Sequence, residues 1–242
     1  MLTKRQQLLL KAIIEEFMET AGAVGSLNIS EKYALDVSPA TIRNEMAKLS
    51  EMGFLEKSHA SSGRKPTSRA MRFFVNQLMD EIDVLDSLVA TTSREALFQK
   101  RFDVDNLLRY SVESLSNICN QPSLVMVSGR KYSAGIYEFI DQIEYQDIKK
   151  LKLVLSIIED YDSLMRLFDK SSKNQGSVNV LIGDDTGIDE LSDSAILFTE
   201  FSFYGQDRGY LGVIGPSRMR YRVVIPAIQH VAENIEDVVQ GW

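Results

Sequence analysis

Residues 38–46 constrain the fold of this chain more than any other stretch, because they combine a marked helix start with a fixed inward face. Ser38 can accept a hydrogen bond from a free amide of the first turn, and Pro39 sits where a missing N–H costs nothing. Ile42, Met46 and Leu49 recur at helical spacing and predict one buried face. The pattern therefore predicts a short, capped helix.

The opposite face of this predicted helix carries side chains that suit the major groove of DNA. Arg43 can hold the O6 and N7 atoms of guanine, and Asn44 can hold the N6 and N7 atoms of adenine. The methyl group of Ala40 can contact a thymine methyl. The helix by itself fits an ordinary solvated face equally well, so the neighbouring segments must decide between the two interpretations.

Two helical patterns precede this helix. Residues 4–20 form the first, which ends before Gly22, and residues 26–33 form a shorter second helix with Ile29, Tyr33 and Leu35 facing inward. A tight turn at residues 36–38 joins the second helix to the third. This order predicts a helix followed by a helix-turn-helix.

A wing is predicted after the third helix. Residues 53–57 read as extended, residues 58–64 as a polar loop with a glycine, and residues 65–67 as a return strand. Polar and basic side chains at the wing tip suit phosphate oxygens or the minor groove. His59 there is more simply an exposed loop histidine than a catalytic group. The candidate DNA-binding residues are Ser38, Ala40, Thr41, Arg43, Asn44, Lys48, His59, Arg64 and Lys65.

Charge separates the first part of the chain from the rest. The chain has 27 basic and 34 acidic residues, a net charge of −7. Residues 1–76 contain 11 basic and 8 acidic residues, net +3, which leaves a net charge of −10 for the remainder. Contact with DNA phosphates requires positive charge near the duplex rather than over the whole chain, so the partition favours DNA binding by residues 1–76.

Composition limits the classes of protein to which the chain can belong. Its 242 residues are 44% hydrophobic and 25% charged, which is enough for two domains with cores of their own. The single cysteine, Cys119, excludes an internal disulfide and a cysteine-cluster metal site, reads as a small buried hydrophobe, and fits a reducing cytoplasm. No apolar run approaches 18 residues, and the start of the chain reads as a folded helix rather than a signal peptide.

The remaining segments predict an α+β body behind a helical linker. A helix over residues 69–88 carries an apolar stripe suited to a partner helix, made of Phe73, Phe74, Leu78, Ile82 and Leu85. Further helices are predicted over 105–120, 148–168 and about 217–239, where Pro226 either kinks the helix or marks its true start, and strands over 124–127, 178–182, 195–204 and 209–214. The expected domains are 1–76 for DNA binding, 77–104 as helical linker and 105–242 as regulatory and dimerisation domain.

No segment of the body predicts a catalytic, metal or cofactor site. Asp184, Asp185 and Asp189 lack the spacing of a calcium loop and read as a solvated turn. The glycines at 209, 212 and 215 read as hairpin or close-packing glycines. The arginines at 218, 220 and 222 could assist an anion at the start of the last helix, but pairing with the acidic body or facing a partner explains them better. His230 has neither a cysteine nor a second histidine nearby.

Several motifs together resemble one protein family. They are LTKRQQ at 2–7, VGS at 24–26, DVSPATIRNEM at 36–46, SGRKPT at 62–67, EYQD at 144–147 and GVIGPSRMRY at 212–221. In these runs the chain resembles the heat-inducible transcription repressors of the HrcA family. The resemblance implies a winged helix-turn-helix followed by a GAF-like α+β domain. It also implies a homodimer that binds an inverted repeat before chaperone operons, with the chaperonin GroEL as a further partner.

The chain departs from the family pattern in its length. Family members carry an inserted dimerising domain between the segments that correspond here to Val127 and Gly135, where this chain has almost nothing. The chain thus resembles a short member. Its predicted function is dimeric, sequence-specific repression of heat-shock genes; the alternative is a winged-helix regulator whose GAF-like domain senses a small effector. An enzyme gains no support, because the residues assemble no acid, base and nucleophile.

Overall fold

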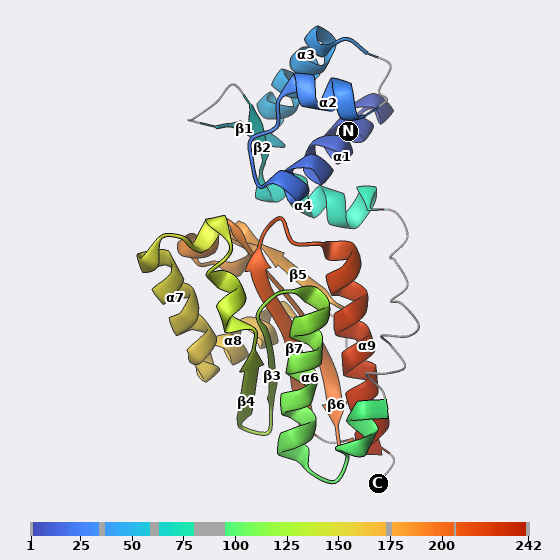
Figure 1. Ribbon diagram of the computed structural model, residues 1–242, viewed down its shortest axis with the longest axis vertical. Coiled ribbons are helices and arrows are strands. Elements are labelled where there is room, and N and C mark those ends of the chain that lie inside the picture. Colours follow the sequence, from blue (N-terminus) through green and yellow to red (C-terminus); the bar gives the residue numbers. More distant parts are fainter. Residues whose placement is uncertain are drawn as a thin grey trace. The chain divides into compact units, whose positions relative to one another are not determined.

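A computed structural model describes residues 2–33, 37–58, 63–79, 95–172, 176–205 and 207–240. The chain divides into two units, Met1–Glu81 and Ile82–Trp242 (Figure 1). The first holds three helices, a small sheet and a further short helical segment. The second is built on a five-stranded sheet covered by helices.

The three helices of the first unit lie where the sequence predicts them, and side chains cap two of them. Helix α1 (Lys4–Thr20) starts with a capping box between Thr3 and Gln6, which satisfies two otherwise free amides. Helix α2 (Ser26–Lys32) follows, and α3 (Pro39–Glu51) starts at Ser38, whose hydroxyl accepts a hydrogen bond from the Thr41 amide at 3.2 Å. The predicted helix-turn-helix order is confirmed, while Leu35 lies outside the described residues.

The wing is a short antiparallel sheet. Strand β1 (Leu55–Lys57) pairs with β2 (Arg64–Pro66), and Val24 adds a bridge to Arg64 through two main-chain hydrogen bonds of 2.8 and 2.9 Å. Gly63 permits this bridge, because a Cβ there would lie 2.9 Å from the backbone of Ala23. The wing loop at residues 59–62 lies outside the described residues.

The helix after the wing ends earlier than the sequence predicts. Helix α4 (Ser68–Phe73) continues as the π-helical turn η1 (Phe74–Leu78), and Met79 has an extended backbone. The prediction of one helix over residues 69–88 is therefore wrong. Phe74 is also buried within the first unit, so it cannot serve a stripe that faces a partner helix. Ile82, Leu85 and most of the predicted helical linker lie outside the described residues.

The second unit contains an antiparallel sheet in the order β4-β3-β7-β6-β5. Its strands are β3 (Ser123–Val127), β4 (Arg130–Ala134), β5 (Asn179–Ile182), β6 (Ser194–Phe203) and β7 (Asp207–Pro216). The predicted hairpin of the two long strands is confirmed as β6 and β7, which pair from Ser194↔Pro216 to Phe203↔Asp207. Sequence analysis missed β4, whose exposed Arg130 and half-buried Lys131 suit an edge strand.

Helices cover both faces of this sheet. Helices α6 (Val104–Cys119) and α9 (Tyr221–Gln240) pack together along one face (Figure 1). On the other face, α7 (Ile148–Glu159) and α8 (Tyr161–Ser171) supply Val154, Ile158, Leu164 and Phe168 to a core shared with β3, β6 and β7. Burial on two sides explains why β3 is apolar from Leu124 to Val127. The predicted fold class, a winged helix-turn-helix followed by an α+β domain, is confirmed.

Two helical predictions for this unit need correction. Residues 148–168 form two helices rather than one, because Asp160 leaves the helical conformation and its carboxylate caps α8 by accepting from the Ser163 amide at 3.1 Å. The last helix begins at Tyr221 rather than near residue 217, and Pro226 lies inside it.

The stretch in which the resemblance places a family insertion is a tight hairpin here. Ser128 and Gly129 join β3 to β4, and both have positive φ angles, 51° and 74°. Two consecutive positive φ angles define the type I′ turn, whose twist matches that of paired strands. The chain therefore crosses from β3 to β4 through two residues, with no room for a further domain.

Close packing explains the glycines of β7. A Cβ at Gly209 would meet the ring of Phe201 on the paired strand, and a Cβ at Gly212 would lie 2.8 Å from the carbonyl oxygen of Leu197. The prediction that these glycines serve close packing is confirmed, since side chains there would collide with the neighbouring strand.

Candidate nucleic-acid interface

Helix α3 is held by one face and exposes the other. Ile42, Met46 and Leu49 are buried as predicted, in the core that α1 and α2 share with α3. The side chains of Ser38, Ala40, Arg43, Asn44 and Lys48 are exposed, and Thr41 is half-buried with its hydroxyl 3.0 Å from that of Ser38. The structure thus brings six of the nine predicted contact residues onto one short helix and its cap.

Arg43 and Asn44 present free polar groups. Within the described part of the chain, neither side chain makes a hydrogen bond or an ion pair. Free guanidinium and amide groups on an exposed helix face cost little in water, and they are the groups that can form bidentate bonds with guanine and adenine. Their geometry therefore agrees with base reading, because no bond to another described residue must break first.

A buried carboxylate anchors α3 to the start of α1. Glu45 is only 5% exposed and accepts hydrogen bonds from Arg5 Nη2 at 2.8 Å, Gln6 Nε2 at 3.0 Å and Lys48 Nζ at 3.1 Å. The bonds from Lys48, Gln6 and Arg5 hold the pKa of this carboxyl below its ordinary value of 4.5. A buried charge persists only when it is paired in this way, so the network fixes how α3 sits on α1.

The Glu45 network changes the interpretation of Lys48 and brings Arg5 to the same place. Both cations are more than half exposed, yet each keeps one donor on the same carboxylate oxygen. Sequence reasoning selected Lys48 as a DNA-binding residue but did not select Arg5 or Glu45. One sequence signal pointed to Glu45: it lies beside the inward apolar positions 42, 46 and 49 of the same helix.

The wing places basic side chains side by side. Lys57 lies directly opposite Arg64, and Glu56 opposite Lys65, in the register of β1 and β2. Paired residues of antiparallel strands project on the same side of the sheet, so Lys57 and Arg64 form a small positive patch. Sequence reasoning selected Arg64 and Lys65 but missed Lys57. His59 lies outside the described residues.

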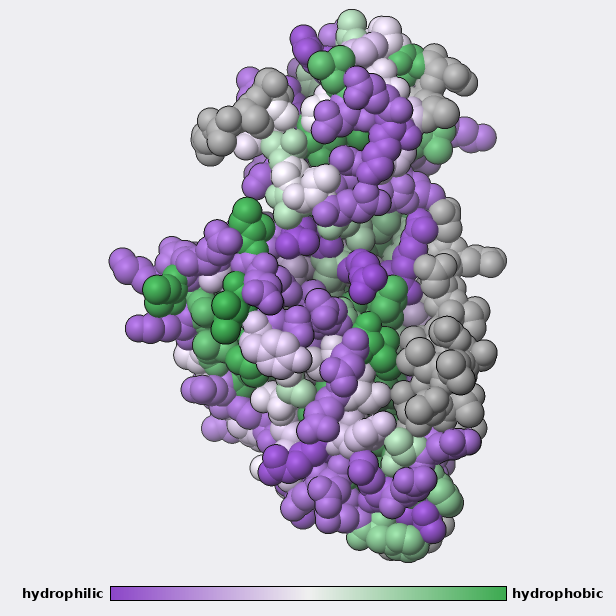
Figure 2. Space-filling model, viewed as in Figure 1, coloured by the Kyte–Doolittle hydropathy of each residue, from purple (hydrophilic) through white to green (hydrophobic). Residues whose placement is uncertain are grey.

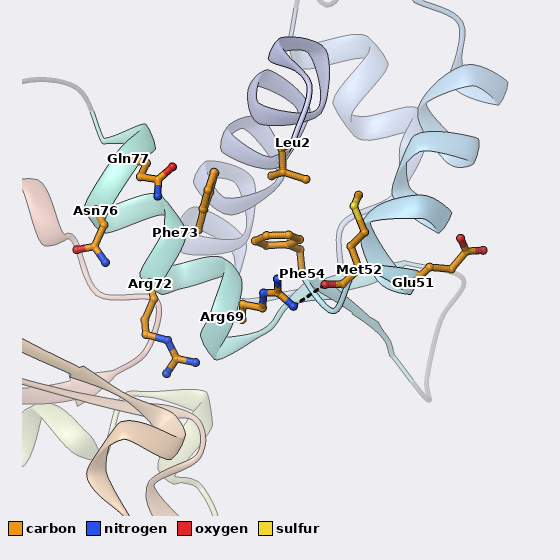
Figure 3. Close-up of a pocket in the computed structure, with 9 residues that line it drawn as sticks. All are labelled: Leu2, Glu51, Met52, Phe54, Arg69, Arg72, Phe73, Asn76 and Gln77. Carbon is orange, nitrogen blue, oxygen red and sulfur yellow. Dashed lines mark hydrogen bonds between the residues drawn. The ribbon is translucent and has the colours of Figure 1, made fainter.

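A cavity of about 680 Å³ lies elsewhere in the first unit (Figure 3). Its floor includes Phe54 and Phe73, whose rings meet edge to face at 5.4 Å. Arg69 lies 4.7 Å from the ring centroid of Phe54 and donates to the carbonyl oxygen of Met52 at 2.9 Å. None of the nine predicted DNA-binding residues lines this cavity, so it is separate from the face of α3.

Two of the side chains selected from the sequence of the second unit, Arg218 and Cys119, are engaged in structure. Arg218 forms a two-pronged ion pair with Glu144, at 2.6 and 3.1 Å, as predicted for an arginine that pairs with the acidic body. Cys119 is buried, which confirms its interpretation as a buried hydrophobe, and this burial raises the pKa of its thiol to about 12. In the described ranges, no group of three His, Cys, Asp or Glu side chains could hold a metal ion.

Comparison with known proteins agrees with this arrangement. The family model for the winged helix-turn-helix transcription repressor, HrcA DNA-binding, matches residues 1–80, and that for the HrcA protein C terminal domain matches residues 64–225. This chain belongs to the HrcA family. Among the described residues, no helix is both long and apolar enough to cross a membrane.

HrcA relatives are matched along nearly their whole length but are longer. Heat-inducible transcription repressor HrcA of Syntrophobacter fumaroxidans is 24% identical over 341 aligned positions, covering 99% of this chain and 98% of that protein. The protein of the same name from Clostridium acetobutylicum is 27% identical over 335 positions, with 97% and 96% covered. At least 99 of the 341 positions have no residue in this chain, so the prediction of a short HrcA member is confirmed.

One solved structure shares the fold across the chain. It is described as "Crystal structure of a hypothetical protein at 2.2 A resolution", and it matches with a TM-score of 0.77 at 16% sequence identity, covering 99% of this chain and 98% of that one. At this identity the likeness concerns the fold.

Proposed function

We propose that this HrcA-family chain is a transcriptional repressor that reads an inverted-repeat operator before heat-shock genes. The observation that carries the proposal is the exposed pair Arg43 and Asn44 on the capped helix of a winged helix-turn-helix, for which the described residues provide no internal partner. Membership of a family whose curated members are named heat-inducible transcription repressors supports the regulatory role.

The interface residues divide into two roles. Arg43 and Asn44 contact base edges, with Ala40 beside them for a thymine methyl, and these contacts give sequence preference. Ser38, Thr41, Lys48, Arg64 and Lys65, together with His59, contact phosphates and set the position of α3 on the duplex. We add Arg5 and Lys57 to the phosphate contacts, because each lies beside a residue already assigned to that role.

A single winged helix reads too few bases for specific repression. Two copies on half-sites one or more helical turns apart supply the missing contacts, and an inverted repeat matches the two-fold symmetry of such a pair. We therefore propose a homodimer on double-stranded DNA, acting in the cytoplasm where its operator lies. The chaperonin GroEL, which the family resemblance adds as a partner, would keep the repressor active until unfolded protein competes for it.

Fluorescence anisotropy tests the proposal with the purified chain. The probe is the inverted repeat upstream of its own chaperone genes, and the competitor is a scrambled duplex of equal length at physiological salt. We expect the wild type to prefer the repeat, and Asn44→Ala to lose about 1–3 kcal/mol of binding free energy on the repeat alone. Asn76→Ala is the matched control, since it removes an exposed amide from the same unit outside α3.

The outcomes separate base reading from general attraction to DNA. Equal, weak binding of the wild type to both duplexes would contradict the proposal. Equal effects of Asn44→Ala and Asn76→Ala would contradict the role given to α3. Chaperonin dependence is measured separately, by adding purified GroEL with and without unfolded substrate to the same assay; unchanged repeat affinity in both mixtures would remove that partner.

A further inference from the structure

One segment of the second unit is apolar on both of its sides. Residues 136–145 comprise the 3₁₀ turns η2 (Ile136–Phe139) and η3 (Ile143–Tyr145), linked by main-chain hydrogen bonds three residues apart at 138, 140, 142 and 145. Residues at i and i+3 share a face in such a backbone. The inward positions are Ile136, Phe139, Gln142 and Tyr145.

The outward positions of the same repeat are also apolar. Tyr137 is 63% exposed, Ile140 is 67% exposed and Ile143 is 57% exposed, and Ile148 at the start of α7 is 66% exposed. We call these four residues the outward stripe. Figure 2 shows hydrophobic residues at the surface over α7 and the segment that leads into it. A segment that only covered the core would carry polar residues at these positions.

The outward stripe is held firmly from below. The rings of Phe139 and Tyr145 meet edge to face at 4.5 Å, and the Tyr145 hydroxyl lies 3.0 Å from that of Ser194 on β6. The ion pair of Glu144 with Arg218 ties the segment to the start of α9. Apolar side chains on an anchored backbone form a fixed surface, and such surfaces in soluble proteins mark sites of protein contact.

We propose that the outward stripe is the surface through which a second copy of this chain docks. The inference rests on the proposed function, which requires two copies on an inverted repeat. It explains how a chain at least 99 aligned positions shorter than its relative still pairs. The stripe follows directly after the β3–β4 hairpin that closes the expected insertion point.

Charge around the outward stripe fits contact between identical copies. Asp141 and Asp147 lie between residues of the stripe, and Lys149 and Lys152 follow it on α7, all four exposed. Lys150 is already paired with Asp193 at 2.9 Å. A two-fold axis places the acidic end of one copy against the basic end of the other, so one surface is complementary to itself. A partner surface of uniform charge would match either the acidic end or the basic end of the stripe, but not both.

Sedimentation of the full chain tests the docking surface. We expect the wild type to dimerise, and Ile140→Asp with Ile143→Asp to weaken the dimer at least about tenfold, since two charges would enter an apolar contact. Phe102→Asp is the matched control, because Phe102 is 72% exposed on the same unit outside the stripe. Ile140→Ser is a milder variant, and thermal melting checks that all variants remain folded.

DNA binding distinguishes failure of this inference from failure of the proposed function. The double variant should bind a single half-site as the wild type does and lose its preference for the two-site repeat. Three outcomes would overturn the docking surface alone. The double variant could stay dimeric, or the Phe102→Asp variant could become monomeric instead. The third is a monomeric wild type that still prefers the repeat. A wild type with no preference for the repeat would overturn the proposed function. If the wild type is monomeric and the Ile140→Ser variant loses GroEL binding, the stripe belongs to that partner and the inference is overturned.

Discussion

Helix α3 and the segment 136–145 are both anchored through one face, but they expose opposite chemistry. Helix α3 presents a guanidinium and a carboxamide to solvent, above Ile42, Met46 and the buried carboxylate of Glu45. The segment 136–145 presents isoleucines and a tyrosine above the ring pair of Phe139 and Tyr145. Exposed polar groups match base edges and phosphates, whereas exposed apolar groups match another protein surface. The difference supports the proposed DNA contact of the first unit and the proposed protein contact of the second.

Salt concentration should affect binding at the two surfaces most differently. DNA binding releases counterions, so raising salt from about 50 to about 200 mM should weaken repeat binding about a thousandfold if about six phosphates are contacted. An apolar contact gains nothing from counterion release, so the dimer should change little. Sedimentation and anisotropy over the same salt series give the measurement. A dimer that dissociates as steeply as the DNA complex would break the comparison.

Within the first unit, variants should separate base reading from phosphate contact. Arg43→Ala should cost about 1–3 kcal/mol on the repeat and relax preference at one base pair. Arg64→Ala should weaken repeat and scrambled DNA alike and reduce the salt slope by about one unit. Anisotropy with single-base variants of the repeat measures both effects. Identical losses on the two duplexes for both variants would refute the division of roles.

Glu45 should make the stability of the first unit depend on pH. Glu45→Gln keeps the shape but removes the charge that Arg5 and Lys48 share, which should cost about 1 kcal/mol at neutral pH. The pKa of Glu45 is lowered by folding, so its stabilisation is fully present above about 4.5 and is lost as pH falls through the lower folded value.

Thermal melting of wild type and Glu45→Gln between pH 7 and pH 3 tests this sign. The difference in stability should shrink as the pH falls below about 4.5, because the protonated wild-type side chain resembles the amide. Glu56→Gln, an exposed glutamate on β1, serves as the control and should show almost no difference at any pH. A stability difference between wild type and Glu45→Gln that grows as the pH falls would contradict the role given to the Glu45 ion pairs.

Charge reversal beside the outward stripe should have the smallest effect. Asp141→Lys should weaken the dimer about two- to fivefold, because exposed ion pairs contribute little. Combining it with Lys149→Glu should recover part of the loss if the copies meet acidic end to basic end. Sedimentation equilibrium measures both. A tighter dimer for Asp141→Lys alone would show that the charges around the stripe are not complementary in the proposed sense.

Much of the first unit could be predicted from the sequence because its signals are local. Helix α3 is one example: its cap at Ser38 and its inward residues Ile42, Met46 and Leu49 lie within 12 residues of one another. The hydrogen bonds that cap this helix also lie within that span. The division of the interface residues into base and phosphate contacts stays a prediction.

Local signals misled where a distant segment decides the outcome. Residues 148–168 carry helical periodicity throughout, yet Asp160 breaks them in two because α7 and α8 each turn an apolar face to the same sheet. The apolar stripe over residues 69–88 included Phe74, which the core of the first unit buries. Strand β4 carries charged residues and becomes visible as a strand only through its pairing with β3.

The sequence by itself determined the first three helices, the inward face of α3, the wing and the family motifs. Tertiary structure decided that Glu45 is buried and paired, and that Tyr137, Ile140 and Ile143 are left exposed. The physical reason is range. Caps and periodic faces are formed by residues a few positions apart, whereas the burial of a charge or the exposure of an isoleucine depends on which distant segments come to lie against it.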